Sequence, residues 1–463
     1  MPDISLIQGC IIGYFIFVYV IGFLKKSDPD INSYIFAGRR LTMPAFVATL
    51  VSTWYGGILE VGRFTYENGV VTWIIFGLFY YVAALLFVKY IAPKIIKSNI
   101  PTIPELFLKS FGKIPALMAI FCILLLTSPA PYLKILATLF DSVWDIPHFW
   151  ALVLGSFLSI VYAITGGFSA VVRTDKLQFV LMFSGFAILL YSAYTQYGGL
   201  SFLIKNTPEY AFLIPGNFSW TFIFVWGFIA LITFIDPGFY QRSFAGQSLQ
   251  TVQKGMLISV GFWVIFDCMT VLSGLYALAI LPTVNSSPYL DLAAQLLSPI
   301  AQGIFLVSLF AIVMSTVDSF TFISAFTIGK DIPKVLELKL SDQKVIQLTQ
   351  LGLGITAIIS IILAHQFEHA IDIWYLMGSF AVPTLLIPLI VALYQLEIKN
   401  PIPLLLFPLL IAVGWHIWGI THLTIDGYPG YIWGLDPMYP GVVTSVVLLI
   451  KLKMKSLILT HLL

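Results

Sequence analysis

Apolar runs of about 20 residues recur along the whole chain, and they constrain its fold more than any other feature. A run of that length crosses the hydrocarbon core of a bilayer as an α-helix. The chain of 463 residues is 59% hydrophobic and 10% charged, whereas a soluble protein carries about 25% charged residues. The sequence therefore predicts an all-α polytopic membrane protein.

Thirteen apolar segments can be delimited, and the connections between them are too short for a soluble domain. Their approximate ranges are 4–24, 42–67, 69–92, 114–140, 148–167, 171–194, 219–240, 253–281, 300–329, 343–365, 371–394, 402–421 and 440–455. We expect a single transmembrane domain over residues 1–463.

Positive charges alternate between successive loops. Of the 24 Lys and Arg residues, 21 lie in every second connection or at its helix ends, and the opposite loops hold only Lys205. Lys and Arg are enriched in short cytoplasmic loops. The pattern predicts an N-terminus outside the cell, a cytoplasmic C-terminus and a multi-pass protein of the cytoplasmic (inner) membrane. The sequence contains no basic patch with interleaved aromatic residues, so it does not indicate nucleic-acid binding.

Two segments that lie five positions apart contain glycine interruptions. Gly56 and Gly57 interrupt segment 42–67, and Gly227 interrupts segment 219–240. Paired broken helices are typical of transporters built from inverted repeats. Backbone carbonyls that unwinding frees must find a partner, and a bound cation is one.

Segment 300–329 contains the sequence SLFAIVMSTVDSFTF, whose polar residues lie near the expected middle of the membrane. Ser308, Ser315, Asp318, Ser319 and Phe322 share one helical face because their spacings are 3, 4 and 7. An intramembrane Asp is costly and by default faces a cavity or a partner. Two interpretations stay open for the hydroxyls: they bind a small monovalent cation, or they hydrogen bond within and between helices.

Four motifs occur in order along the chain. They are FAGRRL at 36–41, YAITGGFSAVVRTDKLQ at 162–178, IDPGFYQRSFAGQS at 235–248 and MSTVDS at 314–319. Together they resemble the sodium/solute symporter family, which includes carriers for proline, pantothenate, sugars, sialic acid and choline. The resemblance covers about residues 34–395.

The resemblance implies a LeuT-like fold with ten core helices in two inverted repeats of five. The implied parts are an extra N-terminal helix at 4–24, a first repeat at 42–194, a second repeat at 219–394 and two extra C-terminal helices at 402–455. This adds to thirteen helices, in agreement with the apolar segments.

The resemblance also implies a sodium site between segments 42–67 and 300–329. The expected ligands are the carbonyls of Ser52, Tyr55 and Ile312 and the hydroxyls of Ser315 and Thr316.

Three further polar residues are expected near this site. Asp175 resembles an aspartate on the ion's exit path; the alternative is a surface salt bridge to Arg173 or Lys176. Asp318 and Ser319 are expected around the ion, and Asp318 either binds a second ion or only hydrogen bonds to neighbouring hydroxyls. We favour the supporting role for Asp318. Arg242 is expected to anchor a helix end together with Asp236.

The solute is expected at the broken helices, where its contacts would include Trp54, Gly56, Gly57 and Trp226. Glu60 and Arg63 lie three residues apart, so they either pair with each other or one of them binds a charged group of the solute. An aromatic wall with Glu60 would suit an amine or quaternary ammonium. Arg63 or Lys134 would instead suit a carboxylate.

The function expected from these residues is sodium-coupled symport of a small organic solute by alternating access. The partners are Na⁺, the solute and the lipid bilayer. A monomer could suffice, and no enzymatic activity is expected. The alternatives are a proton-coupled carrier of the same fold, in which Asp175, Asp318 or Glu60 takes the proton, and a transporter-like membrane sensor.

Overall fold

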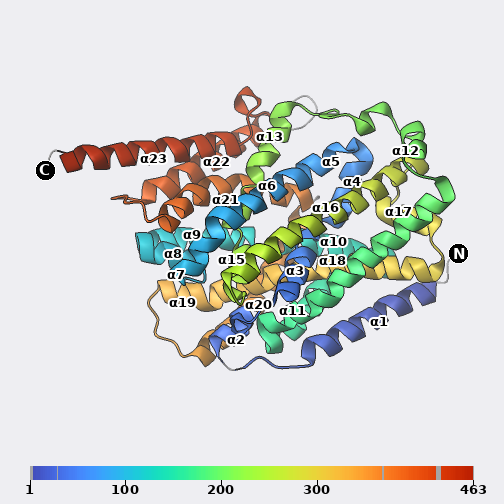
Figure 1. Cartoon of the computed structure of the whole chain (residues 1–463), viewed down its shortest axis with the longest axis horizontal. Coiled ribbons are helices and arrows are strands. Elements are labelled where there is room, and N and C mark those ends of the chain that lie inside the picture. Colours follow the sequence, from blue (N-terminus) through green and yellow to red (C-terminus); the bar gives the residue numbers. More distant parts are fainter. Residues whose placement is uncertain (1–3, 29, 368–369, 424–428, 462–463) are drawn as a thin grey trace.

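The computed structural model describes residues 4–28, 30–367, 370–423 and 429–461, and these are helical with no β-strand among them. Ten of the described helices are long and apolar enough to cross a membrane, or eleven if one bent pair counts as a single span. The chain is therefore an all-α polytopic membrane protein, as predicted. The long helices run roughly along the longest axis of the molecule (Figure 1).

The helices of the predicted spans follow in chain order. They are α1 (Ile4–Phe23), α3 (Met43–Ser52), α4 (Ile58–Asn68), α5 (Val71–Trp73), α6 (Phe79–Leu86), α7 (Ala92–Ser98), α9 (Lys113–Leu126), α10 (Ala130–Trp144), α11 (His148–Tyr197), α13 (Trp220–Ile229), α14 (Ile232–Ile235), α15 (Pro237–Ala245), α16 (Leu249–Ile280), α18 (Pro299–Phe326), α19 (Ile332–Val335), α20 (Asp342–Gln366), α21 (Ala370–Leu393), α22 (Ile402–Thr421) and α23 (Met438–His461).

Four short helices lie in the connections between these spans. They are α2 (Ile31–Phe36), α8 (Ile103–Phe111), α12 (Leu200–Asn206) and α17 (Pro288–Leu296).

Helix α18 occupies the interior of the bundle. It packs against α11, α1, α10 and α20, and 78% of its most apolar window is buried, against 33% for α1 and 28% for α22. The polar residues of α18 therefore face protein rather than lipid.

The start of α1 and the end of α23 lie at opposite ends of the longest axis (Figure 1).

The predicted break in segment 42–67 is present. Helix α3 ends at Ser52, a 3₁₀ turn covers Thr53–Tyr55, and α4 begins at Ile58. The two helices meet at an angle of 57°.

The second predicted break lies a few residues beyond Gly227. Gly227 is helical within α13, and the interruptions fall at Ala230–Leu231 and at Asp236. A Cβ atom on Gly227 would lie 3.2 Å from the ring of Phe79. Close packing, rather than unwinding, accounts for this glycine.

Helix α11 carries two of the predicted segments and changes direction at Gly167, whose φ of 54° and ψ of −153° are not helical. At about 1.5 Å per residue, 50 residues greatly exceed the bilayer thickness. The Tyr34 hydroxyl donates to the carbonyls of Ala163 (3.1 Å) and Ile164 (3.0 Å) just before this turn. The Gly-Gly motif therefore marks a turn between two spans.

Segment 114–140 was predicted without a break, but the structure interrupts it between Leu126 and Ala130. Pro129 and Pro131 flank the start of α10. Proline lacks an N–H and clashes with the preceding turn, so it ends the first helix and is tolerated at the start of the second.

Candidate functional site

The break between α3 and α4 lies against the middle of α18. The Thr316 hydroxyl donates to the carbonyl of Thr53 at 2.9 Å and to that of Ile312 at 3.3 Å. A Cβ on Gly56 would lie 2.6 Å from the Thr316 Cβ. The glycine thus allows the unwound backbone to approach α18 closely.

Ser315 lies beside Thr316 and faces a carboxylate. Its hydroxyl donates to the Ser52 hydroxyl at 2.9 Å and to Asp175 Oδ1 at 2.7 Å. The Thr49 hydroxyl donates to Asp175 Oδ2. All four side chains are fully buried, so Asp175 belongs to the interior of the site.

The alternative pairing of Asp175 at the surface is not formed. Arg173 donates to the carbonyls of Ile21 (3.2 Å), Gly22 (2.8 Å) and Lys25 (2.8 Å). This tethers the end of α1 to α11.

The oxygens gathered here have the chemistry of a site for a small hard cation. Three hydroxyls (Ser52, Ser315, Thr316), the carbonyls of Thr53 and Ile312, and the Asp175 carboxylate converge from α3, α18 and α11. Each hydroxyl keeps acceptor lone pairs when it donates elsewhere. The predicted residues Ser52, Ile312, Ser315 and Thr316 are therefore close together. Tyr55 ends the 3₁₀ turn that follows Ser52, and its side-chain hydroxyl donates to the Trp263 carbonyl at 3.1 Å.

Arg242 lies next to this group and is almost completely buried. Its guanidinium donates to the hydroxyls of Thr53 (2.7 Å) and Ser319 (2.9 Å). Asp236 accepts hydrogen bonds from the backbone of Gly238 (2.6 Å) and Phe239 (3.3 Å) and so caps the start of α15. Ser319 therefore contacts Arg242, and Asp236 anchors a helix end as predicted.

Asp318 points to a different partner. The Tyr162 hydroxyl donates to Asp318 Oδ2, and Asp318 Oδ1 has no hydrogen-bond partner among the described residues. The Thr174 hydroxyl lies 3.5 Å from that of Tyr162. This arrangement joins α18 to both halves of α11.

A central cavity of about 150 Å³ lies beside the helix break, on the side of Trp54 and Gly57. Trp226, on α13, also lines it, so three of the predicted solute contacts share one cavity. Gly56 lies behind it, packed against Thr316 and Tyr132.

Glu60 and Arg63 lie in another cavity, of about 500 Å³, further along α4. They form an ion pair of 2.8 Å, and Glu67 lies 3.4 Å from the same guanidinium. Lys134 lines this cavity as well. The mutual pairing that the spacing allowed is present, and neither residue lines the central cavity.

Besides Thr49, which donates to Asp175, the site residues Thr53 and Asp267 were not singled out from the sequence. Thr53 offers its carbonyl to Thr316, and Asp267, on α16, lines the central cavity. A signal for Asp267 exists, because it is the only charged residue between Lys254 and Asp291 and an ionisable residue inside an apolar segment indicates a functional site by default.

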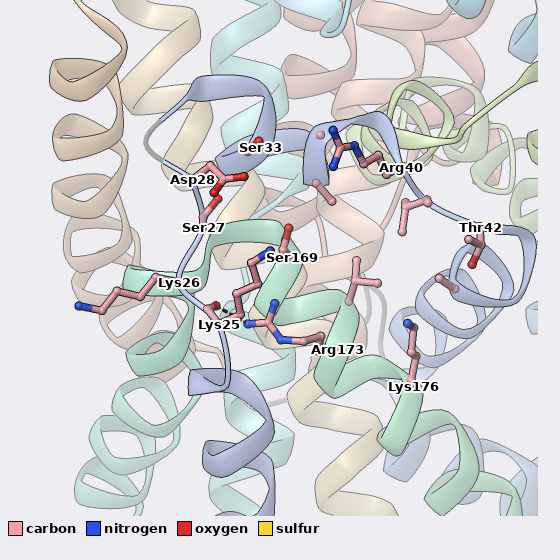
Figure 2. A pocket seen from close by; sticks show the side chains of 15 residues that line it. Lys25, Lys26, Ser27, Asp28, Ser33, Arg40, Thr42, Ser169, Arg173 and Lys176 are labelled. Atoms are coloured by element: carbon pink, nitrogen blue, oxygen red, sulfur yellow. Dashed lines mark hydrogen bonds between the residues drawn. The ribbon is translucent and has the colours of Figure 1, made fainter.

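A third cavity, of about 320 Å³, lies where the 25–45 region meets α11. Figure 2 shows Lys25, Lys26 and Arg40 around it together with Arg173 and Lys176. Among the described residues that line it, Asp28 is the one acidic side chain. Basic residues from two of the predicted cytoplasmic connections thus meet at one end of the molecule.

Comparisons with known proteins and with family models point to the same family. The family model described as "Sodium:solute symporter family" matches residues 34–399. The chain is 28% identical over 342 residues to a sodium/proline symporter of Haemophilus influenzae, covering 66% of each chain. It is 24% identical over 412 residues to an osmoregulated proline transporter of Bacillus subtilis, covering 81% of this chain and 82% of that protein.

Solved structures share the fold. A Na⁺-coupled sialic acid symporter in a substrate-bound outward-open state superposes with a TM-score of 0.77 at 17% identity, covering 98% of each chain. MhsT, solved in complex with L-phenylalanine, gives a TM-score of 0.51 at 14% identity, covering 88% of this chain and 97% of that one.

Proposed function

Because the chain belongs to the sodium:solute symporter family, and is thus a transporter rather than an enzyme, we propose that it couples the import of a small organic solute to sodium entry. The protein would act as a multi-pass carrier in the cytoplasmic membrane. The observation that carries this proposal is the convergence of Ser315, Thr316 and Asp175 on the broken helix.

The proposed ion ligands are the hydroxyls of Ser315 and Thr316 and carbonyls at the helix break and on α18. The resemblance supplies Ser52, Tyr55 and Ile312 for the carbonyls, and the Thr316–Thr53 hydrogen bond adds the Thr53 carbonyl as a candidate. Asp175 would draw the ion from this site toward the cytoplasm, because an uncompensated carboxylate lowers the energy of an approaching cation.

Sodium would act by binding one conformation more tightly than the other. A cation between α3–α4 and α18 joins two elements that must separate when the site opens to the cytoplasm. Such differential affinity is what allows an ion to shift the conformational equilibrium. The repeats at 42–194 and 219–394 would then rock to expose the solute inside.

The proposed orientation places the N-terminus outside and the C-terminus in the cytoplasm. Its support is the basic cavity of Figure 2, where five Lys and Arg side chains from separate connections gather. A concentration of this kind is expected on the cytoplasmic face.

The test is the thermal stability of the purified chain in lipid nanodiscs, with NaCl exchanged for KCl at constant ionic strength and pH. A ligand that binds only the folded state raises the unfolding midpoint by mass action. We expect a saturable rise with Na⁺. If K⁺ gives the same curve and a shift appears only on lowering the pH, the proton-coupled alternative replaces this proposal.

A further inference from the structure

We propose that the transported solute carries a positive charge, as an amine or quaternary ammonium group, and that Asp267 is its counter-charge in the central cavity. This inference rests on the proposed function, since it names the solute class of that carrier. The observations that support this inference are the charges and the aromatic rings that line the cavity.

The lining of the central cavity is acidic. Asp236 and Asp267 both contribute to it, and the described lining residues include no Lys, Arg or His. Arg242 offsets the charge of Asp236, so a carboxylate-bearing solute would meet a like charge chiefly at Asp267, whereas a cation would meet an opposite one there. In a site withdrawn from water this difference is large, because screening is weak.

Asp267 is fixed in place and lacks a cationic partner. It is 7% exposed, and the Tyr81 hydroxyl donates to its Oδ2. No ion pair to Asp267 is formed within the described part of the chain. A buried charge without a partner is costly, and an entering cation would supply the missing charge.

Aromatic rings make up much of the remaining wall. Trp54, Tyr80, Tyr132, Trp226 and Trp374 all line the cavity. Edge-on and tilted contacts hold them in place: Trp54 packs on Tyr80 with centroids 5.3 Å apart, and Tyr132 packs on Trp374 at 5.6 Å. Ring faces attract cations, and most strongly when water is excluded.

The nearest buried cation, Arg242, does not reverse this conclusion. Its guanidinium donates to Thr53, Ser319 and the Gly238 carbonyl, and it is not part of the central lining. Arg63 is likewise paired with Glu60 in a different cavity. Neither offers an unoccupied positive charge to a solute carboxylate in the central cavity.

The experiment compares two probes of the same shape, choline and the uncharged 3,3-dimethyl-1-butanol. Binding to the full chain in nanodiscs is measured by isothermal titration calorimetry in NaCl, with tetramethylammonium and acetate as further probes. We expect both ammonium probes to bind at least about tenfold more tightly than the neutral alcohol, and acetate not to bind.

Asp267→Asn should remove that preference. The affinity for choline should fall at least about tenfold, whereas the affinity for the alcohol should stay nearly unchanged. Glu397→Gln, which neutralises an exposed carboxylate in the α21–α22 connection, is the matched control and should keep the preference. A retained sodium-dependent rise in the unfolding midpoint shows that Asp267→Asn still folds.

The outcomes separate this inference from the proposed function. If sodium stabilises the protein but neither ammonium probe binds better than the alcohol, or Asp267→Asn leaves the preference intact, the solute class is wrong and sodium coupling stands. If sodium has no effect at all, the proposed function itself fails.

Discussion

At the residue scale, one hydroxyl pair explains why polar side chains occupy the middle of α18. Thr316 reaches the unwound backbone at Thr53, and Ser315 reaches Asp175. The two neighbours thus join α18 to α3 and the helix break, and Ser315 also joins it to α11. Ser308, on the same helix, donates to the Phe305 carbonyl of its own helix at 2.7 Å. It therefore provides a control for Ser315 and Thr316, which contact other elements.

Ser315→Ala should raise the sodium concentration for half-maximal stabilisation by about tenfold, because one of the few direct oxygen ligands is lost. Sodium titrations of the unfolding midpoint measure this. Ser308→Ala should leave the sodium dependence unchanged. Equal effects of both substitutions would mean that general packing, rather than ion ligation, is responsible.

Asp175→Asn should also weaken sodium binding, because it removes the one carboxylate that hydrogen bonds to Ser315. We expect a larger effect than for Ser315→Ala, since a full charge in a buried site contributes more than one neutral dipole. The same titration in NaCl and KCl checks it. An unchanged sodium affinity would place the ion away from α11.

At the element scale, the interruption between α3 and α4 positions both the proposed ion site and the central cavity. One side of the 3₁₀ turn contacts α18 through Thr53, and the adjoining Trp54 and Gly57 line the central cavity. An uninterrupted helix could not do this, because its carbonyls would be hydrogen bonded within the helix. The glycines at 56 and 57 allow side chains of other helices to pack against the break.

Gly56→Ala should abolish the sodium-dependent rise in the unfolding midpoint. Its Cβ would lie 2.6 Å from Thr316 and 2.5 Å from Tyr132, so either the backbone or Thr316 must move. The control is Gly354→Ala on α20, whose Cβ would meet nothing within 4 Å. A normal sodium response in Gly56→Ala would show that the close approach is not needed.

At the scale of the whole molecule, a buried ionic network ties α8 to residues 330–334, which lie just after the end of α18. Glu105 forms ion pairs with Lys330 and Lys334, and Lys330 lies 3.2 Å from Asp331. The Thr102 hydroxyl donates to Asp331 at 3.0 Å. The network links a connecting helix to the segment just after the helix that carries the proposed ion site.

Glu105→Gln should destabilise the fold by about 3 kcal/mol, because it leaves buried Lys330 with one partner fewer. Lys334→Gln should cost less than about 1 kcal/mol, since the Lys334 side chain is 53% exposed and exposed pairs contribute little. Unfolding measurements in nanodiscs test the order. An equal loss of unfolding free energy in the two variants would show that the buried Glu105–Lys330 pair contributes no more than the exposed Lys334 pair.

The same network predicts a pH dependence. Burial alone would raise the pKa of the Glu105 carboxyl, but Lys330 and Lys334 more than offset it and hold the pKa below its ordinary value. The folded state then gains stability above the unfolded pKa of about 4.3 and loses it as the pH falls further. The unfolding midpoint should drop below about pH 4.5, and less steeply in Glu105→Gln.

The proposed orientation is also a property of the whole chain. A green fluorescent protein fused after residue 463 should fluoresce, because it would remain in the cytoplasm, and an alkaline phosphatase fused there should be inactive. The opposite pair of results would reverse the orientation inferred from the alternating charges.

Much of the fold could be predicted from the sequence because a bilayer imposes strong local rules. Apolar segments of sufficient length must be helical, and each of the thirteen predicted segments overlaps helical structure in the described chain. Ser315 and Thr316 of MSTVDS could be proposed as ion ligands only through the resemblance to the symporter family, because hydroxyls in lipid are equally satisfied by hydrogen bonds within and between helices.

Only the tertiary structure decided which of the charged residues line the central cavity. Glu60, Arg63 and Asp267 are each unusual in an apolar segment, and their sequence context does not rank them. Packing pairs Glu60 with Arg63 in a separate cavity and brings Asp267 of α16 to the aromatic wall formed by α3–α4, α6, α10, α13 and α21. The physical reason is that apolar segments predict which residues enter the membrane, whereas the crossing of helices distant in sequence determines which side chains meet there.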